Sequence, residues 1–154
     1  MNETIIHICS KDRAGEVGML LTSLLNQTYK SFDVVLLDDG SNVPLGNFYF
    51  INYLMLRMKQ NGNNITIIRN NIPSGVSKAR QHLIDWSLKN GKHKFFVRID
   101  DDSIVENDYI EQLLITLGMG YDVSCGLVPF IGGVDTIREL KFVEPIIGEC
   151  QLND

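Results

Sequence analysis

The chain has 154 residues, of which 44% are hydrophobic and 21% charged, and its formal net charge is −5. This length and composition predict one globular domain with a proper core rather than two domains. Since Lys and Arg form no run or patch, we expect no nucleic-acid partner, and the acidic balance argues against binding to an anionic membrane surface.

The first half of the chain alternates apolar runs with a helical pattern. Ile5–Cys9 is an apolar run, as expected for a strand buried on both faces of a sheet. Leucines at i, i+3 and i+4 spacing predict an amphipathic helix over Glu16–Gln27. Asp33–Leu37 is the second predicted strand, and Phe48–Asn61 is the second predicted helix. We expect the aromatic residues of this second helix to face the core rather than a ligand.

The second half continues the same alternation. The turn-forming residues of Asn70–Gly75 predict a loop, and the helix that follows it extends to about Lys89. Ser74 or Ser77 is the expected N-cap of that helix. The remaining elements are a predicted helix over Asn107–Leu117 and predicted strands over Ile65–Ile68, Phe95–Ile99 and Asp122–Val128.

Strand–helix alternation of this kind predicts an α/β fold whose sheet is mostly parallel, with helices on both faces. In such sheets, ligands bind at the carboxyl ends of the strands. The two densest polar clusters, Asp38–Ser41 and Asp100–Ser103, both follow predicted strands. We therefore expect them to meet in one crevice, although about sixty residues separate them in the sequence.

Asp100, Asp101 and Asp102 place three adjacent carboxylates at the end of the fourth predicted strand. Their mutual repulsion costs stability unless a positive charge compensates it, and hard oxygen ligands favour Mg²⁺ or Mn²⁺. The alternative is a solvated acidic turn that caps the next helix. A twelve-residue calcium loop starting at Asp100 is excluded, because Val105 stands where such a loop requires glycine.

Other polar residues near the strand ends have both functional and structural interpretations. Asp39 could accept a hydrogen bond from a base or a ribose, or simply form an Asp-Gly turn. Arg80, at the start of a helix with Lys78, could bind a diphosphate through its planar fork, or be a solvated helix cation. The sequence contains no glycine-rich dinucleotide motif and no P-loop. Structural roles are expected for the histidines His7, His82 and His93.

The three cysteines are odd in number and widely spaced, so we expect neither a disulfide framework nor a zinc site. The amino terminus has no basic region, and the apolar run after it is too short for a signal peptide or a membrane span. We therefore expect a reduced, cytoplasmic protein with no transmembrane segment, peripheral to the inner face of the membrane if its acceptor is lipid-linked. The cysteines are Cys9, Cys125 and Cys150.

Five segments occur in the order typical of one protein family: Ile5–Arg13, Ser23–Tyr29, Phe32–Ser41, Asn71–Arg80 and Asp100–Asp102. Together they resemble the donor half of family 2 glycosyltransferases with the GT-A fold. The resemblance runs from about Ile5 to Val128, which is most of the chain. Lys11 and Asp12 stand where the family has an aromatic residue and Asn.

The resemblance implies which residues bind the nucleotide. Asp39 would hydrogen-bond the base, commonly uracil. Arg80 would approach the base or the diphosphate. The base pocket would be lined by Cys9, Ser10 and Lys11.

The resemblance also implies roles for the aspartate triplet. Asp101 or Asp100 would face the ribose, while Asp102, with Asp100, would hold the Mn²⁺ or Mg²⁺ ion that bridges the diphosphate. A metal at this position would stabilise the negative charge that develops on the leaving nucleoside diphosphate.

The implied activity is metal-dependent transfer of a sugar, with inversion, from a UDP-linked donor to an acceptor hydroxyl. The acceptor would be a carbohydrate or a lipid-linked molecule, and polysaccharide biosynthesis is the usual setting of the family. The alternative is a donor-binding module that holds a nucleotide sugar without transferring it. A nucleotidyltransferase is disfavoured, because the glycine-rich amino-terminal loop that its chemistry needs is absent.

We expect a single nucleotide-sugar-binding domain over residues 1–154, with 129–154 as the start of an incomplete acceptor region. Inverting transfer needs a carboxylate base, and no catalytic base can be identified after the triplet. The available carboxylates, none in a recognisable motif, are Asp135, Glu139, Glu144 and Glu149. An apolar set near the end could add an edge strand or form a homodimer contact, and both interpretations stay open. Its members are Phe142, Val143, Ile146 and Ile147.

Overall fold

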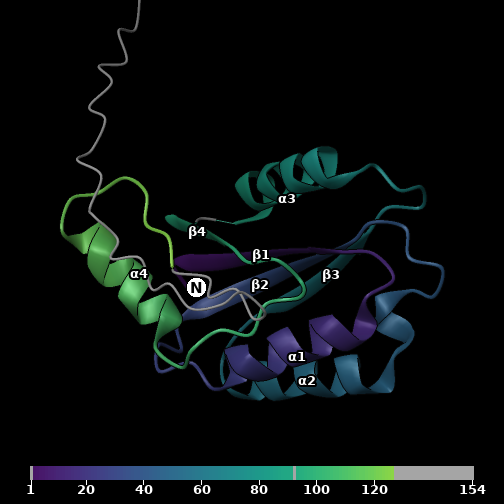
Figure 1. Ribbon diagram of the computed structural model, residues 1–154, viewed down its shortest axis with the longest axis horizontal. Helices are drawn as coiled ribbons and strands as arrows, with labels where there is room; N and C mark the ends of the chain where they lie inside the picture. The colour runs from purple at the N-terminus through teal and green to yellow at the C-terminus, as the bar shows by residue number, and fades with distance from the viewer. Residues whose placement is uncertain (1, 92, 127–154) are drawn as a thin grey trace, which may run out of the picture.

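A computed structural model describes residues 2–91 and 93–126 of the chain (Figure 1). Strands and helices alternate, as the sequence predicts. The elements are β1 (Thr4–Ser10), α1 (Ala14–Leu25), β2 (Phe32–Asp38), the 3-10 helix η1 (Leu45–Asn47), α2 (Tyr49–Gln60), β3 (Ile65–Arg69), α3 (Val76–Asn90), β4 (Phe95–Arg98) and α4 (Tyr109–Gly118).

The described strands form one parallel sheet in the order β3-β2-β1-β4. β1 lies in the centre and pairs with β2 from Thr4 opposite Phe32 to Ser10 opposite Asp38. β3 ends opposite Asp38 as well, at Arg69. Because parallel strands end on the same side, the loops that follow all four strands emerge at one edge of the sheet.

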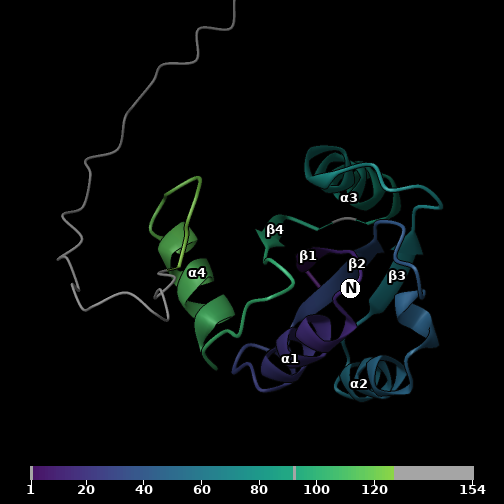
Figure 2. The ribbon, with the colours of Figure 1, turned by 45° about the vertical axis from the view of Figure 1, so that its right-hand side comes forward.

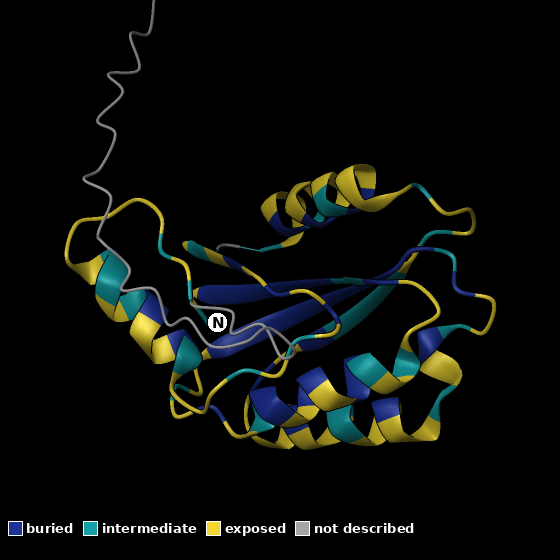
Figure 3. Ribbon diagram, in the orientation of Figure 1, coloured by how far each residue is buried: buried dark blue, intermediate teal, exposed yellow. Residues whose placement is uncertain are grey.

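Helices cover both faces of the sheet, with α1 and α2 on one face and α3 on the other (Figures 1 and 2). The strands are mostly buried, whereas the outer sides of the helices are exposed (Figure 3). This three-layer arrangement confirms the predicted α/β class with helices on both faces.

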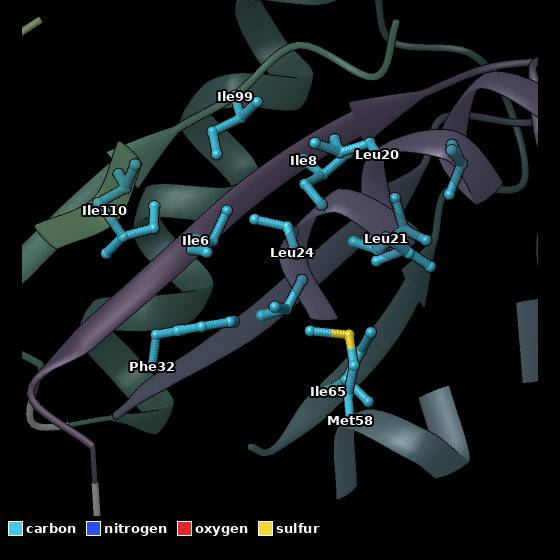
Figure 4. Close-up of a cluster of buried hydrophobic side chains, with 14 of the residues drawn as sticks. Ile6, Ile8, Leu20, Leu21, Leu24, Phe32, Met58, Ile65, Ile99 and Ile110 are labelled. Atoms are coloured by element: carbon cyan, nitrogen blue, oxygen red, sulfur yellow. The ribbon is translucent and has the colours of Figure 1, made fainter. Parts of the chain in front are cut away.

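Two apolar cores lie between these layers. The larger core packs α1, α2 and α4 against one face of the sheet (Figure 4). Leu24 of α1 and Ile6 of β1 are both fully buried there. The smaller core lies under α3, where Leu83 and Ala79 contact the opposite face of the sheet at Val35. Side chains of alternating strand residues therefore enter different cores, which explains the nearly continuous apolar character of β1 and β2.

The predicted helices and the first four predicted strands are confirmed, with ends that differ from the prediction by at most two residues. The predicted fifth strand is wrong over its described part, since Asp122–Gly126 forms no strand. Val123 is 82% exposed there, and this segment pairs with none of the four described strands. The remainder of the predicted strand, residues 127 and 128, lies outside the described residues.

Residues 129–154 also lie outside the described residues. This segment contains the expected acceptor region, the four carboxylates named above as available bases and the apolar set.

Two further expectations are wrong. Neither Ser74 nor Ser77 caps α3: its N-cap is Gly75, and no side chain bonds the exposed backbone amides of the first turn. The Ser74 hydroxyl instead donates to the Asp39 carboxylate, at 2.8 Å, because charge makes that acceptor stronger. The expectation that the aromatic residues of the second helix face the core is wrong for Tyr49 and Tyr53, which are 84% and 47% exposed, whereas Phe48, directly before α2, packs against the larger core.

None of the helices in the described part of the chain combines the length and the apolar character that crossing a bilayer requires.

The larger core is tested by Leu24→Ala. Leu24 is fully buried, so we expect a loss of about 2–5 kcal/mol in the free energy of unfolding, measured by urea denaturation. Leu56→Ala is the matched control, because Leu56 is 52% exposed and should lose no more than about 0.5 kcal/mol. Equal losses at the two positions would contradict this placement of the core.

Candidate functional site

The candidate site lies at the carboxyl edge of the sheet, where the loops after β1, β2, β3 and β4 meet. Ser10 ends β1, Asp38 ends β2 and Arg69 ends β3, and these three residues are in register across the sheet. Beyond β4, the Ile99 amide donates to the His7 carbonyl at 3.2 Å, so the chain stays beside β1 until it reaches the aspartate triplet. Both polar clusters noted in the sequence therefore occupy this edge, as predicted.

Asp38 is fully buried beneath the site. Within the described residues, its carboxylate is held by hydrogen bonds and an ion pair from three residues of the chain. Its carboxylate accepts hydrogen bonds from the Ser41 amide at 2.8 Å and the Leu45 amide at 3.0 Å, and it pairs with the Arg69 guanidinium. Burial alone would raise the pKa of Asp38, but these hydrogen bonds outweigh it and hold the pKa below its ordinary value. Asp38 is thus an ionised structural anchor for the loop after β2.

Asp39 accepts hydrogen bonds from the loop between β3 and α3. The donors are the Asn70 side chain at 2.7 Å, the Ser74 amide at 2.9 Å and hydroxyl at 2.8 Å, and the Gly75 amide at 3.0 Å. Burial raises the pKa of Asp39, yet these donors more than compensate and lower it overall. The carboxylate is therefore ionised at neutral pH and fixes the entrance to α3.

Two tight backbone turns complete the frame. Gly40 has a φ of 76°, and a Cβ there would lie 2.9 Å from the backbone nitrogen of Pro73, so only glycine fits. Asp12 also has a positive φ, of 57°, a conformation that Asp and Asn tolerate best among non-glycine residues. Its amide donates to the Ser41 hydroxyl at 2.9 Å, and its carboxylate accepts from the Asn42 amide at 2.6 Å. The loops after β1 and β2 are thereby joined.

Two arginines compensate part of the charge of the aspartate triplet. Nη1 of Arg13 lies 3.2 Å from Asp101 Oδ1 and 3.0 Å from Asp102 Oδ2. Nη2 of Arg80 lies 3.1 Å from Asp100 Oδ1. The sequence predicts that a positive charge must compensate these carboxylates, and in the described structure guanidinium groups do so.

The triplet offers oxygen donors that suit a hard cation, but not a complete protein cage. Within residues 2–91 and 93–126, no group of three or more His, Cys, Asp or Glu side chains could hold a metal ion. Asp100 and Asp102 have side chains that are 58% and 57% exposed, so their carboxylates can be reached from solvent. Mg²⁺ and Mn²⁺ are commonly bound by one or two carboxylates together with substrate phosphates, and the donor set fits that arrangement.

The remaining predicted nucleotide-binding residues lie at the end of β1 or just after it. Ser10 is buried, and its hydroxyl has no hydrogen-bond partner among the described residues. Lys11 is exposed and forms no ion pair with any described residue. Cys9 shares a cavity of about 220 Å³ with Arg80 and Asp100, under α3. Burial, aided by Asp39 and the triplet, raises the pKa of Cys9 to about 11, so at neutral pH it is a thiol and not a nucleophilic thiolate.

The three histidines have separate polar partners, and no Ser/His/Asp set forms among the described residues. His7 contacts the Ser87 hydroxyl at 2.8 Å, and burial lowers the pKa of His7 to about 4. His93 contacts Asp33 at 3.2 Å. These contacts agree with the structural roles expected from the sequence.

A larger hollow of about 740 Å³ lies between α1, α2 and residues 104–107, and its lining begins two residues after Arg13 and Asp102, at Gly15 and Ile104. It contains Met19, Phe50 and Tyr53, and none of the predicted site residues. Its lining is mainly apolar and lacks clustered charges, so we place the candidate site at the strand ends, where the titratable groups converge.

Sequence reasoning missed several residues that organise the site. Arg69 could have been found from register, because it ends β3 directly opposite Asp38. The sequence places Arg13 only within a segment that resembles the family. Its ion pairs depend on the geometry of the loop after β1, which no local sequence pattern reveals. Asp12 was noted as a departure from the family, although it conserves the ability to adopt a positive φ.

Comparison with known proteins gives a family match and several similar folds. The family model described as Glycosyl transferase family 2 matches residues 5–148. No match is found among the curated proteins. The crystal structure of S. aureus TarS residues 1–349 is 20% identical, with a TM-score of 0.57 over 77% of this chain and 33% of that chain. Its complex with UDP is 19% identical, with a TM-score of 0.58 over 77% of this chain and 32% of that chain.

The mannosyltransferase PcManGT from Pyrobaculum calidifontis, in complex with GDP-Man and Mn²⁺, is also similar. It is 14% identical, with a TM-score of 0.54 over 73% of this chain and 31% of that chain. Similarity at these identities establishes the fold alone. This chain spans about a third of the length of these solved structures.

The structural role of Asp38 predicts a pH-dependent effect of Asp38→Asn. At pH 7 we expect a loss of about 2–4 kcal/mol in the free energy of unfolding. The Asn side chain would place an NH₂ group where a carboxylate oxygen now accepts hydrogen bonds from Ser41, Leu45 or Arg69. The folded-state pKa is lowered, so this contribution is complete above the ordinary carboxyl value of 3.8 and is lost as pH falls through the folded-state pKa.

Denaturant titrations between pH 7 and pH 2 measure the effect. The difference between wild type and Asp38→Asn should shrink below about pH 4. Asp85→Asn is the control, since Asp85 is exposed and should change stability little at any pH. A pH-independent difference for Asp38→Asn would contradict the assignment.

Proposed function

We propose that this chain, which belongs to glycosyl transferase family 2, binds a UDP-linked sugar. In this proposal it also takes part in transferring that sugar to an acceptor hydroxyl. The observation that carries the proposal is the meeting of Asp39, Arg80 and the aspartate triplet at one edge of the sheet. Arg80 can bind the phosphates of a nucleoside diphosphate, and the aspartate triplet can bind a divalent cation.

In this proposal the base and ribose bind beside the ends of β1 and β2. Asp39 is ionised, and its Oδ2 accepts from the Gly75 amide, with a longer contact of 3.1 Å from Ser74. A carboxylate oxygen accepts about two hydrogen bonds, so an N–H of the base would have to replace the longer contact from Ser74, whose amide also donates to Oδ1 at 2.9 Å. The unpaired hydroxyl of Ser10 supplies a further polar group nearby. Cys9 and Lys11 complete the pocket that we assign to the base.

The diphosphate end of the donor would lie over the triplet. We assign Asp102 and Asp100 to a Mn²⁺ or Mg²⁺ ion, and Asp101 to the ribose. The bound ion would supply charge stabilisation for the nucleoside diphosphate that leaves when the sugar–phosphate bond breaks. Arg80 would turn its guanidinium from Asp100 to a phosphate oxygen, a geometry that suits its planar fork.

The ligands of the similar structures are consistent with this choice of ligand class. S. aureus TarS is described in complex with UDP and with UDP-GlcNAc, and PcManGT with GDP-Man and Mn²⁺. We propose UDP for this chain, and GDP is the first alternative to test. We further propose inversion at the sugar, a carbohydrate or lipid-linked acceptor, and a cytoplasmic setting in polysaccharide biosynthesis.

A second candidate function is donor binding without transfer. The small share of the similar structures that this chain spans favours it, since an inverting transfer also needs an acceptor site and a carboxylate base. Turnover separates the two functions: both bind the donor, but only the transferase forms a glycosylated product.

Calorimetric titration with UDP, with and without Mn²⁺, tests the donor site. We expect Mn²⁺ to increase UDP affinity in the wild type. Asp102→Ala should bind UDP equally with and without Mn²⁺, because the carboxylate that links metal to diphosphate is gone.

Asp85→Ala is the control for loss of one carboxylate, as Asp85 is exposed and its only described contact is with Gln81 of the same helix. It should retain the Mn²⁺ effect. If Asp102→Ala retains that effect too, the metal role is wrong. If wild type binds neither UDP nor GDP under any condition, the donor-binding function itself fails.

A further inference from the structure

We propose that Arg13 is a resident counter-cation of the aspartate triplet: a divalent metal that binds Asp100 and Asp102 displaces the Arg13 guanidinium from Asp102, and the freed guanidinium then binds the donor diphosphate. The inference rests on the proposed function. It assigns Arg13 a positioning role that couples metal binding to diphosphate binding.

The geometry of one nitrogen atom is the starting point. Nη1 of Arg13 contacts oxygens of two different carboxylates, Asp101 Oδ1 at 3.2 Å and Asp102 Oδ2 at 3.0 Å. The guanidinium thereby neutralises part of the charge of Asp102, a carboxylate that we assign to the metal. The other described cation at the triplet, Arg80, contacts only Asp100.

The sheet topology explains why Arg13 reaches the triplet. β1 and β4 are neighbouring parallel strands, so the loops that follow them leave the sheet side by side. Arg13 lies three residues after β1 and directly before α1. Its neighbour Asp12 is held by Ser41 and Asn42, which fixes the base of the Arg13 side chain beside the triplet.

The guanidinium can be displaced from Asp102 at small cost. The Asp101 side chain is only 10% exposed, whereas the Arg13 side chain is 51% exposed and that of Asp102 is 57% exposed. Ion pairs with this exposure contribute little to stability, because water screens them. A divalent ion carries twice the charge of a guanidinium and must contact its oxygen ligands directly. The metal and Arg13 therefore compete for Asp102.

A displaced Arg13 remains next to groups that favour an anion. It immediately precedes α1, a helix of 12 residues whose first-turn amides and dipole attract negative charge. The planar guanidinium is also well suited to two phosphate oxygens. Metal binding would therefore release a phosphate-binding group at the position where the diphosphate arrives.

Mn²⁺ titration of the full chain without nucleotide, followed by the electron paramagnetic resonance of free Mn²⁺, tests the competition. We expect Arg13→Gln to bind Mn²⁺ roughly three- to tenfold more tightly than wild type, since the competing charge is removed. Lys89→Gln is the matched control, because it removes an equal charge from an exposed residue in the last turn of α3, outside the candidate site. It should raise the affinity much less, and Arg13→Lys should stay close to wild type.

The second measurement is UDP affinity at saturating Mn²⁺, where Arg13→Gln should bind several-fold more weakly than wild type. A merely structural role would weaken both ligands, so opposite effects on Mn²⁺ and on UDP support the proposal. Unchanged or weaker Mn²⁺ binding in Arg13→Gln, or no Mn²⁺ binding in either protein, overturns the competition, and unchanged UDP affinity overturns the diphosphate role. Absence of nucleotide binding in wild type would instead refute the proposed function, while the Mn²⁺ comparison would still decide the competition.

Discussion

The buried carboxylate of Asp38 and its partner Arg69 join the ends of β2 and β3 beneath the candidate site. A buried charge is tolerated only when hydrogen bonds and an opposite charge satisfy it, and here the amides of Ser41 and Leu45 complete the set. The Ser41 hydroxyl in turn accepts from the loop after β1, through the Asp12 amide. The positions of the neighbouring loops thus depend on the ionisation of one residue at the end of β2.

Above these buried groups, the candidate site contains aspartates and arginines in close contact. Asp39 is held by backbone and side-chain donors, whereas the triplet is held by the exposed guanidinium groups of Arg13 and Arg80. The first arrangement is fixed, because it is largely buried. In the second, Asp100 and Asp102 can exchange partners at little cost, because water reaches their carboxylates. Fixed groups suit the recognition of a base, and exchangeable groups suit a diphosphate that arrives with its own counter-ion.

Sequence patterns predicted most of the fold, because the strands are buried on both faces and the helices have regular apolar spacing. The topological rule for parallel sheets then brought Asp39 and the triplet together without any coordinates. Contacts that depend on loop geometry were beyond such rules: the Arg13 ion pairs and the choice of Ser74 between helix cap and Asp39 are examples. The exposed aromatic residues of α2 were misjudged, since a helical apolar stripe does not reveal which neighbours cover it.

The central claim is that a nucleoside diphosphate and its metal bind at the carboxyl ends of the strands. Backbone amide chemical shifts of the ¹⁵N-labelled chain, recorded on adding UDP or GDP with Mg²⁺, test it most directly. The account predicts that the largest changes occur at Ser10, Asp39 and Asp101, with little change at Thr22 and Tyr53, which line the apolar hollow between α1 and α2. Changes concentrated at that hollow, with none at the strand ends, would contradict it.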